Sequence, residues 1–262
     1  MVDFPNSEDT AEDTPMNFKN KRLPGKMALW LAACALIIAA DIPAQAETSK
    51  TSLKGPGVEQ TQETGTSDKN ADTATADITQ AIVVDENGGF HVTVSYYKKQ
   101  TDGTWTQSFQ VPGIYGRNGG TDNKQEGDGK TPYGTYSFTM AFGTKENPGS
   151  ILPYHQIQET DFWIDDSNSA YYNKLVNIAE TPRDWNSGED MSRQGVSYHY
   201  GLALNYNEDC VPGKGSAIFL HCYTETNDSG SAGCIRIPED NMKQLIQSVD
   251  ANTRIMIRKA AE

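Results

Sequence analysis

Two side chains in the C-terminal part of the chain could carry out nucleophilic chemistry together. Cys234 follows the small residues 231–233, which would let a substrate backbone come close to a thiol. A free thiol is mostly protonated at neutral pH, so it needs a nearby base before it can attack a carbonyl. His221 ends an expected strand, and the loop of residues 222–233 is long enough to bring the imidazole to the thiol. The spacing predicts a cysteine–histidine pair, although a histidine at a strand end is more often structural.

The neighbours of this pair suggest where the other groups lie. Gly233 and Cys234 are expected to present adjacent backbone N–H groups to a developing oxyanion. Side chains alternate along a strand, so Cys222 should point away from His221 into the core. Cys210 lies in a turn too far along the expected hairpin to form a disulfide with Cys222. Cys234 is therefore the thiol expected to be reactive.

Residues 215–222 (GSAIFLHC) and 231–238 (SAGCIRIP) resemble the signature of the L,D-transpeptidase catalytic domain, the YkuD-like family. Further stretches resemble the same family, and the match covers nearly all of residues 80–258. These stretches are 127–136, 163–166, 171–173 and 204–207.

The resemblance implies an activity for the pair. Cys234 matches the family's nucleophile and His221 its general base and acid, with the backbone carbonyl of Cys222 orienting the imidazole. The implied substrates are peptidoglycan stem peptides. The thiol would form a thioester with the third residue of a donor tetrapeptide, and an amine of a neighbouring stem would then form a 3→3 crosslink. A carbapenem-type β-lactam would label Cys234.

Five further residues are weaker candidates for substrate or oxyanion contacts: Ser231, Gly233, Arg236, Tyr198 and Tyr200. Arg236 could pair with a substrate carboxylate or brace the loop. The two tyrosines would form cleft walls, or would pack in the core or on the surface.

The remaining histidines are not expected to take part in the reaction, and no metal site is expected. His199 is expected to be packed or on the surface rather than in the cleft, and His91 and His155 to be structural. The chain has no Cys-x-x-Cys pair, and thioester chemistry needs neither a metal nor an organic cofactor, so none is predicted. The Gly-rich run 116–134 lacks a phosphate-loop pattern and is interpreted as turns.

Two departures from the family signature keep other functions open. Ala232 stands where many members have a second histidine, and the spacing from His221 to Cys234 is short. One alternative is a hydrolase on the same scaffold, an L,D-carboxypeptidase or an enzyme that releases wall-attached protein. The other is a non-catalytic protein that binds the cell wall.

The elements that must position these residues are mainly strands. With strands outnumbering helices and no βαβ alternation, we expect a mainly β fold, a mixed sandwich or barrel with a few peripheral helices. The expected strands are 81–84 and 90–97 (a hairpin), 105–111, 135–140, 198–206, 216–222 and 254–258. The expected helices are 167–177 and 238–249, the second with Pro238 in its first turn and apolar residues at helical spacing.

The chain is organised in four segments. Residues 1–15 are an acidic extension, for which Met16 is an alternative start. Residues 16–46 read as a signal peptide with a basic n-region, an apolar run and a small-x-small cleavage site. Residues 47–77 read as a disordered linker with little apolar surface to bury. Residues 78–262 form the predicted catalytic domain.

This organisation predicts a secreted, extracytoplasmic protein of the cell wall, without stable membrane insertion after cleavage. An uncleaved N-terminal anchor is one alternative, and a lipid anchor at Cys34 is another. The net charge of -13 excludes nucleic acid binding through a basic face. The charged fraction of 22% and the mean hydropathy of -0.62 exclude a polytopic membrane protein.

Overall fold

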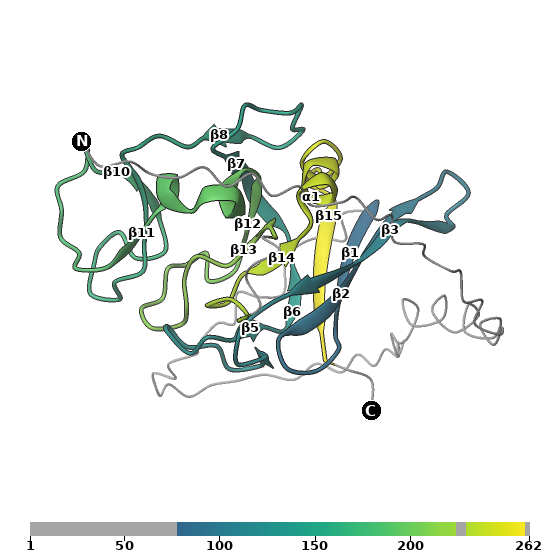
Figure 1. The fold of residues 1–262 in the computed structure, drawn as a ribbon, viewed down its shortest axis with the longest axis horizontal. Helices are drawn as coiled ribbons and strands as arrows, with labels where there is room; N and C mark the ends of the chain where they lie inside the picture. Colours follow the sequence, from purple (N-terminus) through teal and green to yellow (C-terminus); the bar gives the residue numbers. More distant parts are fainter. Residues whose placement is uncertain (1–77, 224–228, 260–262) are drawn as a thin grey trace, which may run out of the picture. The chain divides into compact units, whose positions relative to one another are not determined.

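A computed structural model describes residues 78–223 and 229–259 (Figure 1). The described residues lie in one unit, Thr66–Glu262. The predicted extension, signal peptide and linker all lie outside the described residues, as does part of the 222–233 loop. Within the described ranges, no helix has the length and apolar character needed to cross a membrane.

The expected mainly β, mixed fold is confirmed, and its main sheet curls into a half-barrel. This sheet has ten strands in the order β6-β15-β1-β2-β3-β14-β13-β12-β7-β8. Neighbours are antiparallel except for β1–β15, β13–β14 and β7–β8, which are parallel. The strands are β1 (Gln80–Glu86), β2 (His91–Lys99), β3 (Trp105–Ile114), β6 (Gly134–Tyr136), β7 (Phe138–Gly143), β8 (Tyr154–Gln156), β12 (Gly201–Leu204), β13 (Phe219–Cys222), β14 (Ile235–Ile237) and β15 (Thr253–Arg258).

Smaller elements surround the main sheet. A three-stranded sheet has the order β10-β9-β11, and a two-stranded sheet pairs β4 with β5. The bounds are β4 (Gly120–Thr121), β5 (Thr131–Pro132), β9 (Asp161–Ile164), β10 (Leu175–Asn177) and β11 (Gly188–Asp190). The helices are the 3-10 turns η1 (Met191–Arg193) and η2 (Gly195–Tyr198) and the α-helix α1 (Glu239–Ile246).

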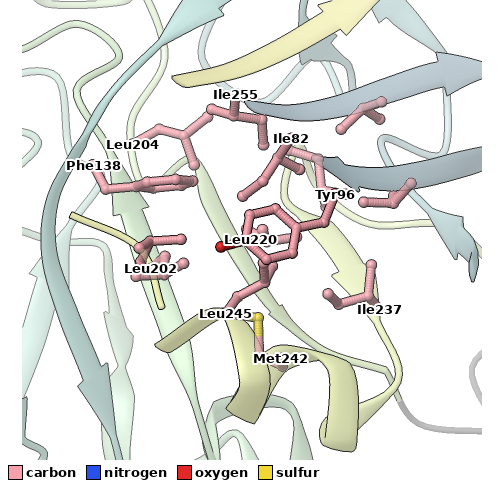
Figure 2. Packing of buried hydrophobic residues seen from close by; sticks show 14 of the residues in the cluster. Ile82, Tyr96, Phe138, Leu202, Leu204, Leu220, Ile237, Met242, Leu245 and Ile255 are labelled. Atoms are coloured by element: carbon pink, nitrogen blue, oxygen red, sulfur yellow. The ribbon is translucent and has the colours of Figure 1, made fainter. Parts of the chain in front are cut away.

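Helix α1 forms where the apolar spacing predicts it. Pro238 is its N-cap residue, and Glu239 and Asp240 in the first turn complement the helix dipole. Its buried side chains are Met242, Leu245 and Ile246. They pack with strands from both halves of the main sheet, among them β1, β2, β7, β12 and β13 (Figure 2). This cluster is the principal hydrophobic core.

The other face of the main sheet carries a second core. Phe142, Ala203 and Phe219 lie there, and Trp163 from β9 stacks edge-on against Phe219 with 4.8 Å between ring centroids. This contact anchors the three-stranded sheet. Alternation along β13 therefore places Leu220 and Cys222 in the principal core, as predicted, and turns Phe219 and His221 to the second face.

The predicted helix over 167–177 is wrong: the segment forms turns followed by β10. Asp166 Oδ1 accepts the N–H of Asn168 at 2.9 Å, and Asp184 Oδ2 accepts that of Ala170 at 3.0 Å. The N–H of Ala170 thus bonds to a side chain from outside the segment, and the N–H of Asn173 donates to the carbonyl of Ile164 at 2.8 Å, so neither has the i→i−4 partner that a helix would supply.

Three predicted strands are shorter or broken. The 198–206 segment begins in η2, and only Gly201–Leu204 is strand. The 216–222 segment becomes strand at Phe219. The 135–140 segment divides into β6 and β7 at Ser137, whose N–H donates to Asn205 Oδ1 at 2.9 Å instead of continuing a ladder.

Candidate active site

His221 and Cys234 line one pocket of about 230 Å³. The parallel pairing of β13 with β14 sets His221 directly beside Arg236. Cys234 precedes Arg236 by two residues, so both side chains leave the chain on the same side while Ile235 and Ile237 enter the principal core. The expected juxtaposition thus comes from strand register.

The orientation of His221 is fixed by two backbone carbonyls. Its Nδ1 lies 3.1 Å from the oxygen of Ser197 and 3.1 Å from that of Cys222. Both partners are acceptors, which assigns the proton to Nδ1 and leaves Nε2 with a free lone pair. Burial, reinforced by the positive charge of Arg236, lowers the pKa of His221 to about 3. The imidazole is therefore neutral and basic at Nε2.

The thiol of Cys234 is also neutral. Burial, followed by the negative charge of Glu189, raises its pKa to about 12. Sγ donates a hydrogen bond to the backbone oxygen of Ala217, 3.1 Å away. The two groups are thus a neutral thiol and a neutral imidazole rather than a thiolate and an imidazolium.

The carbonyl that receives the thiol comes from a strained residue. Ala217 has a φ of 52°, in the left-handed region that residues with a Cβ rarely adopt. Its N–H donates to Asn173 Oδ1 at 3.0 Å, and the same oxygen accepts Trp163 Nε1–H at 3.0 Å. Asn173 therefore ties the second core to the backbone beside the nucleophile.

Asn173 is a residue that sequence reasoning did not select as part of the site. Its Nδ2 donates to the carbonyls of Tyr206 and Asn207, at 3.2 and 2.9 Å. The only signal was that residues 163–166, 171–173 and 204–207 each resemble family stretches. The structure shows that all three meet at this amide.

Ser231 and Gly233 shape the turn before Cys234. Ser231 Oγ accepts the N–H of Gly233 at 3.0 Å and donates to the carbonyl of Cys234 at 2.6 Å. The expectation that Gly233 offers its N–H to an oxyanion is therefore wrong, because that group is already used. A Cβ on Gly233 would lie 3.0 Å from Ile218, which makes glycine the fitting residue.

The two predicted tyrosines lie on opposite faces of the sheet. Tyr198 lines the pocket, packs edge-on against the His221 ring with 5.1 Å between centroids, and donates to Glu189 Oε1 at 2.7 Å. Tyr200 instead lies in the principal core, so its prediction as a cleft wall is corrected. Strand alternation does not apply across them, because the chain leaves η2 at Tyr198 and enters β12 at Gly201.

The other histidines that the sequence set aside lie outside the pocket lining. His199 Nδ1 is 2.9 Å from Glu239 Oε2, and His155 Nε2 is 2.7 Å from Asp161 Oδ2. Cys210, Cys222 and Cys234 are all free thiols, in agreement with the distance argument against a disulfide.

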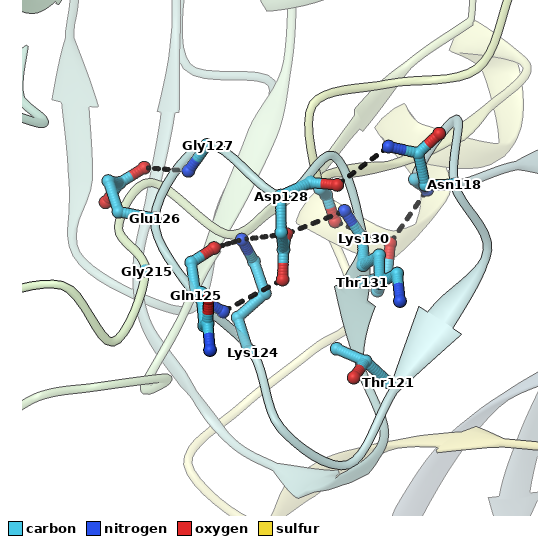
Figure 3. A network of polar contacts seen from close by, with 12 residues as sticks. Asn118, Thr121, Lys124, Gln125, Glu126, Gly127, Asp128, Lys130, Thr131 and Gly215 are labelled. Atoms are coloured by element: carbon cyan, nitrogen blue, oxygen red, sulfur yellow. Dashed lines mark hydrogen bonds and ion pairs between the residues drawn. The ribbon is translucent and has the colours of Figure 1, made fainter.

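The Gly-rich segment forms turns, as interpreted, and closes one side of the pocket. Lys124 Nζ lies 2.7 Å from Asp128 Oδ1, and Asp128 also accepts the N–H groups of Gln125 and Lys130 at 2.8 Å (Figure 3). Lys124 is only 5% exposed, so this ion pair is part of the wall. The loop is held by its own side chains.

Four further charged residues line the pocket: Glu126, Asp165, Glu189 and Arg236. Arg236 was predicted, whereas Asp165 and Glu189 were not. Nε and Nη1 of Arg236 are buried and lack a hydrogen-bond partner among the described residues, as does Oδ1 of Asp165. Burial raises the pKa of the Glu189 carboxyl. Asp165 lies in the family-like stretch 163–166, just after β9, whereas no motif marks Glu189 on β11.

Comparison with known proteins agrees with the geometry. The sequence profile of the L,D-transpeptidase catalytic domain matches residues 79–257. Among curated proteins, no match to the chain was found.

Several solved structures match part of the chain at low sequence identity and low TM-score. L,D-transpeptidase 1 of Mycobacterium tuberculosis is 13% identical, with a TM-score of 0.33 over 69% of this chain and 61% of that one. A variant of the Enterococcus faecium L,D-transpeptidase is 15% identical, with a TM-score of 0.34 over 69% and 50%. L,D-transpeptidase 3 of M. tuberculosis, solved with a faropenem-derived adduct, is 15% identical, with a TM-score of 0.34 over 69% and 60%. The chain thus spans 50–61% of the length of these proteins.

Proposed function

Because this chain belongs to the family of L,D-transpeptidase catalytic domains, we propose that it crosslinks peptidoglycan stem peptides through a thioester on Cys234. The observation that carries the proposal is the shared pocket of Cys234 and His221. Nδ1 of His221 is held by two carbonyls, so Nε2 is free to take the thiol proton. The product is a 3→3 crosslink.

The first half-reaction forms the acyl-enzyme. Sγ attacks the carbonyl carbon of the third residue of a donor tetrapeptide while its proton passes to Nε2 of His221. We assign stabilisation of the resulting oxyanion to the backbone N–H of Cys234. The C–N bond then breaks, and Nε2 returns the proton to the departing terminal D-amino acid.

The second half-reaction transfers the acyl group. An amine of a neighbouring stem attacks the thioester carbon, the new N–C bond forms and the C–S bond breaks. One amine proton passes to Nε2 and from there to Sγ, which restores the neutral pair. No step uses a metal or an organic cofactor. The same thiol would open a carbapenem-type β-lactam ring, and we place the reaction outside the cytoplasm, at the cell wall.

The test is to incubate the protein with a disaccharide tetrapeptide and to look for 3→3 dimers by mass spectrometry. Cys234→Ala should abolish the dimers and also labelling by a carbapenem. Cys210→Ser is the matched control, since it removes a free thiol that does not line the pocket. Dimer formation by Cys234→Ala would refute the mechanism. Tripeptide without dimers would identify a hydrolase, and binding to sacculi without labelling of Cys234 would identify a non-catalytic wall-binding protein.

A further inference from the structure

His199, which does not line the pocket, lies at the end of the 3-10 turn that orients the base. The carbonyl oxygen of Ser197 in η2 lies 3.1 Å from Nδ1 of His221, and His199 follows Ser197 by two residues as the C-cap of the turn. Carbonyls at the C-terminal end of a helical turn have no partner inside the turn, so that of Ser197 can accept from His221. The position of η2 therefore decides where this acceptor lies.

The two acceptors of His221 are fixed in different ways. The carbonyl of Cys222 belongs to the next residue of β13, whereas that of Ser197 comes from another element, 24 residues earlier in the sequence. Burial and the charge of Arg236 lower the pKa of His221, and both carbonyls oppose that shift because they stabilise the charged ring. Loss of the Ser197 carbonyl should therefore make Nε2 a weaker base and leave the tautomer less strictly fixed.

Contacts with β7 and α1 hold the end of η2. The carbonyl of Tyr198 accepts the N–H of Thr144, which follows β7, at 2.8 Å. Nδ1 of His199 lies 2.9 Å from Oε2 of Glu239 in α1. A Cβ on Gly143 would lie 2.3 Å from the carbonyl oxygen of His199, so only glycine lets β7 come this close to the end of the turn.

Glu239 is a well-anchored partner for this histidine. It is the first residue of α1, a helix fixed by its buried side chains in the principal core. Its other oxygen accepts the ammonium of Lys145. Burial opposes ionisation of Glu239, but the hydrogen bonds from Lys145 and His199 outweigh it and hold the pKa of this carboxyl below its usual value. The carboxylate is an acceptor, which assigns a proton to Nδ1 of His199 in either charge state of the ring.

We infer that His199 and Glu239 are positioning residues, which tie η2 to α1 and so hold the Ser197 carbonyl on Nδ1 of His221. The inference rests on the proposed function, in which His221 is the base, and it adds two residues outside the pocket lining. Their loss should act on the reaction only through the tautomer and basicity of His221. Helix α1, which packs the principal core, thus also helps to set the geometry of the site on the other face of the sheet.

The experiment compares the rate of acylation with the tautomer of the base. His199→Ala and Glu239→Ala should each lower the rate at which a carbapenem acylates Cys234 at least fivefold, as measured by stopped-flow absorbance. Glu239→Gln keeps an acceptor oxygen for His199 and should recover most of the rate. His155→Ala is the matched control, since it removes another histidine that has a carboxylate partner and does not line the pocket, and it should keep the rate within twofold.

Nitrogen-15 NMR of the imidazoles gives the readout that a merely structural role would not move. The chain has four histidines, so single variants assign the signals. His221 should have a protonated Nδ1 and an unprotonated Nε2 in the wild type and in His155→Ala, and a mixture of tautomers in His199→Ala. Glu239→Ala provides the same comparison if His199→Ala does not fold.

Two results would overturn the inference. One is acylation of His199→Ala within twofold of the wild-type rate, and the other is a slower rate with an unchanged tautomer of His221. The NMR measurement needs no reaction, which separates this inference from the proposed function. If the wild type is not acylated while the tautomer still depends on His199, the proposed function fails and the positioning role stands.

Discussion

At the residue scale, the site contains a neutral pair held ready for proton transfer. Arg236 lies beside His221 in the strand register and, with burial, opposes protonation of the imidazole. Glu189 and burial oppose ionisation of the thiol. A thiolate–imidazolium pair is therefore disfavoured from both sides. In the proposed mechanism, the thiolate therefore forms only as the S–C bond forms, when negative charge moves from sulfur to the oxyanion.

The pH profile of acylation tests this arrangement. The base form of His221 is required, and its pKa is lowered from 6.5 to about 3, so the imidazole stays in that form well below pH 6. The rate at which a carbapenem acylates Cys234 should therefore change less than about twofold between pH 7.5 and 5. Stopped-flow absorbance of the β-lactam measures it. A tenfold fall per pH unit beginning near pH 6.5 would contradict the lowered pKa.

Site residues could be predicted from the sequence when they lie on one strand or on the loop that follows it. Cys234, His221 and Arg236 were found because alternation and one short loop connect them in the sequence. Glu189 could not be found, because its position depends on how a separate sheet packs through Trp163. Tyr200 was misplaced, because a 3-10 turn interrupts the assumed strand.

At the element scale, Asn173 links three segments of the chain. These links set the position of the Ala217 carbonyl, which accepts the hydrogen bond from the Cys234 thiol. The amide of Asn173 makes four hydrogen bonds, two at Oδ1 and two at Nδ2. Through them the turn before β10 holds the segment before β13, where Ala217 adopts its left-handed conformation. Strain beside a nucleophile persists only where surrounding contacts impose it.

Asn173→Ala should therefore affect both stability and chemistry. Trp163 Nε1–H and the N–H of Ala217 would lose their acceptor, at a cost of about 1–3 kcal/mol each. The acylation rate of Cys234 should fall at least tenfold, because Ala217 is no longer held. Asn173→Asp keeps the acceptor oxygen and should recover most of the rate.

Asn207→Ala is the matched control for that prediction. Asn207 also has a positive φ and bonds to Val211 and Gly215, but it makes no side-chain contact with Ala217. It should lower Tm while keeping acylation within threefold of the wild type. Equal rate losses in Asn173→Ala and Asn207→Ala would show that Asn173 acts on stability alone.

The elements themselves were predictable where a single local signal dominated. The 3.6-residue spacing and Pro238 located α1, and the turn of residues 86–89 located the first hairpin. The helix predicted over 167–177 does not form, because Asp184 accepts the N–H of Ala170 in place of a helical carbonyl. Asp184 is distant in sequence, so a window over the segment could not include it.

Helix α1 fills the concave side of the main sheet, and its packing there leads to a prediction about stability. Leu245 is fully buried there (Figure 2). Leu245→Ala should cost about 2–5 kcal/mol of unfolding free energy through lost burial and the cavity left behind. Leu245→Met keeps the volume and should cost less than about 1.5 kcal/mol. Urea unfolding measures both, and similar midpoints for the two variants would contradict the packing.

At the scale of the whole domain, the first and last strands of the described chain are neighbours in the main sheet. The last strand, β15, lies between β6 and β1, and its pairing with β1 is parallel. Both cores and the site depend on this sheet, yet His221 lies on β13 and Cys234 immediately precedes β14, on the far side of β3 from β15. The pairing of β1 with β15 joins the two ends of the domain, and such a long-range pairing is slow to form.

Removal of residues 253–262 should consequently prevent folding of the entire domain rather than loosen one edge. Thr253, Ile255 and Ile257 are almost fully buried, and each isoleucine alone is worth about 2–5 kcal/mol, so their joint loss matches the typical stability of a domain, about 5–15 kcal/mol. Removal of residues 260–262 keeps β15 whole and should leave Tm unchanged. Circular dichroism and carbapenem labelling of Cys234 report fold and site separately. A shortened protein lacking 253–262 that still labels would show that the site half of the sheet folds without its closing strand.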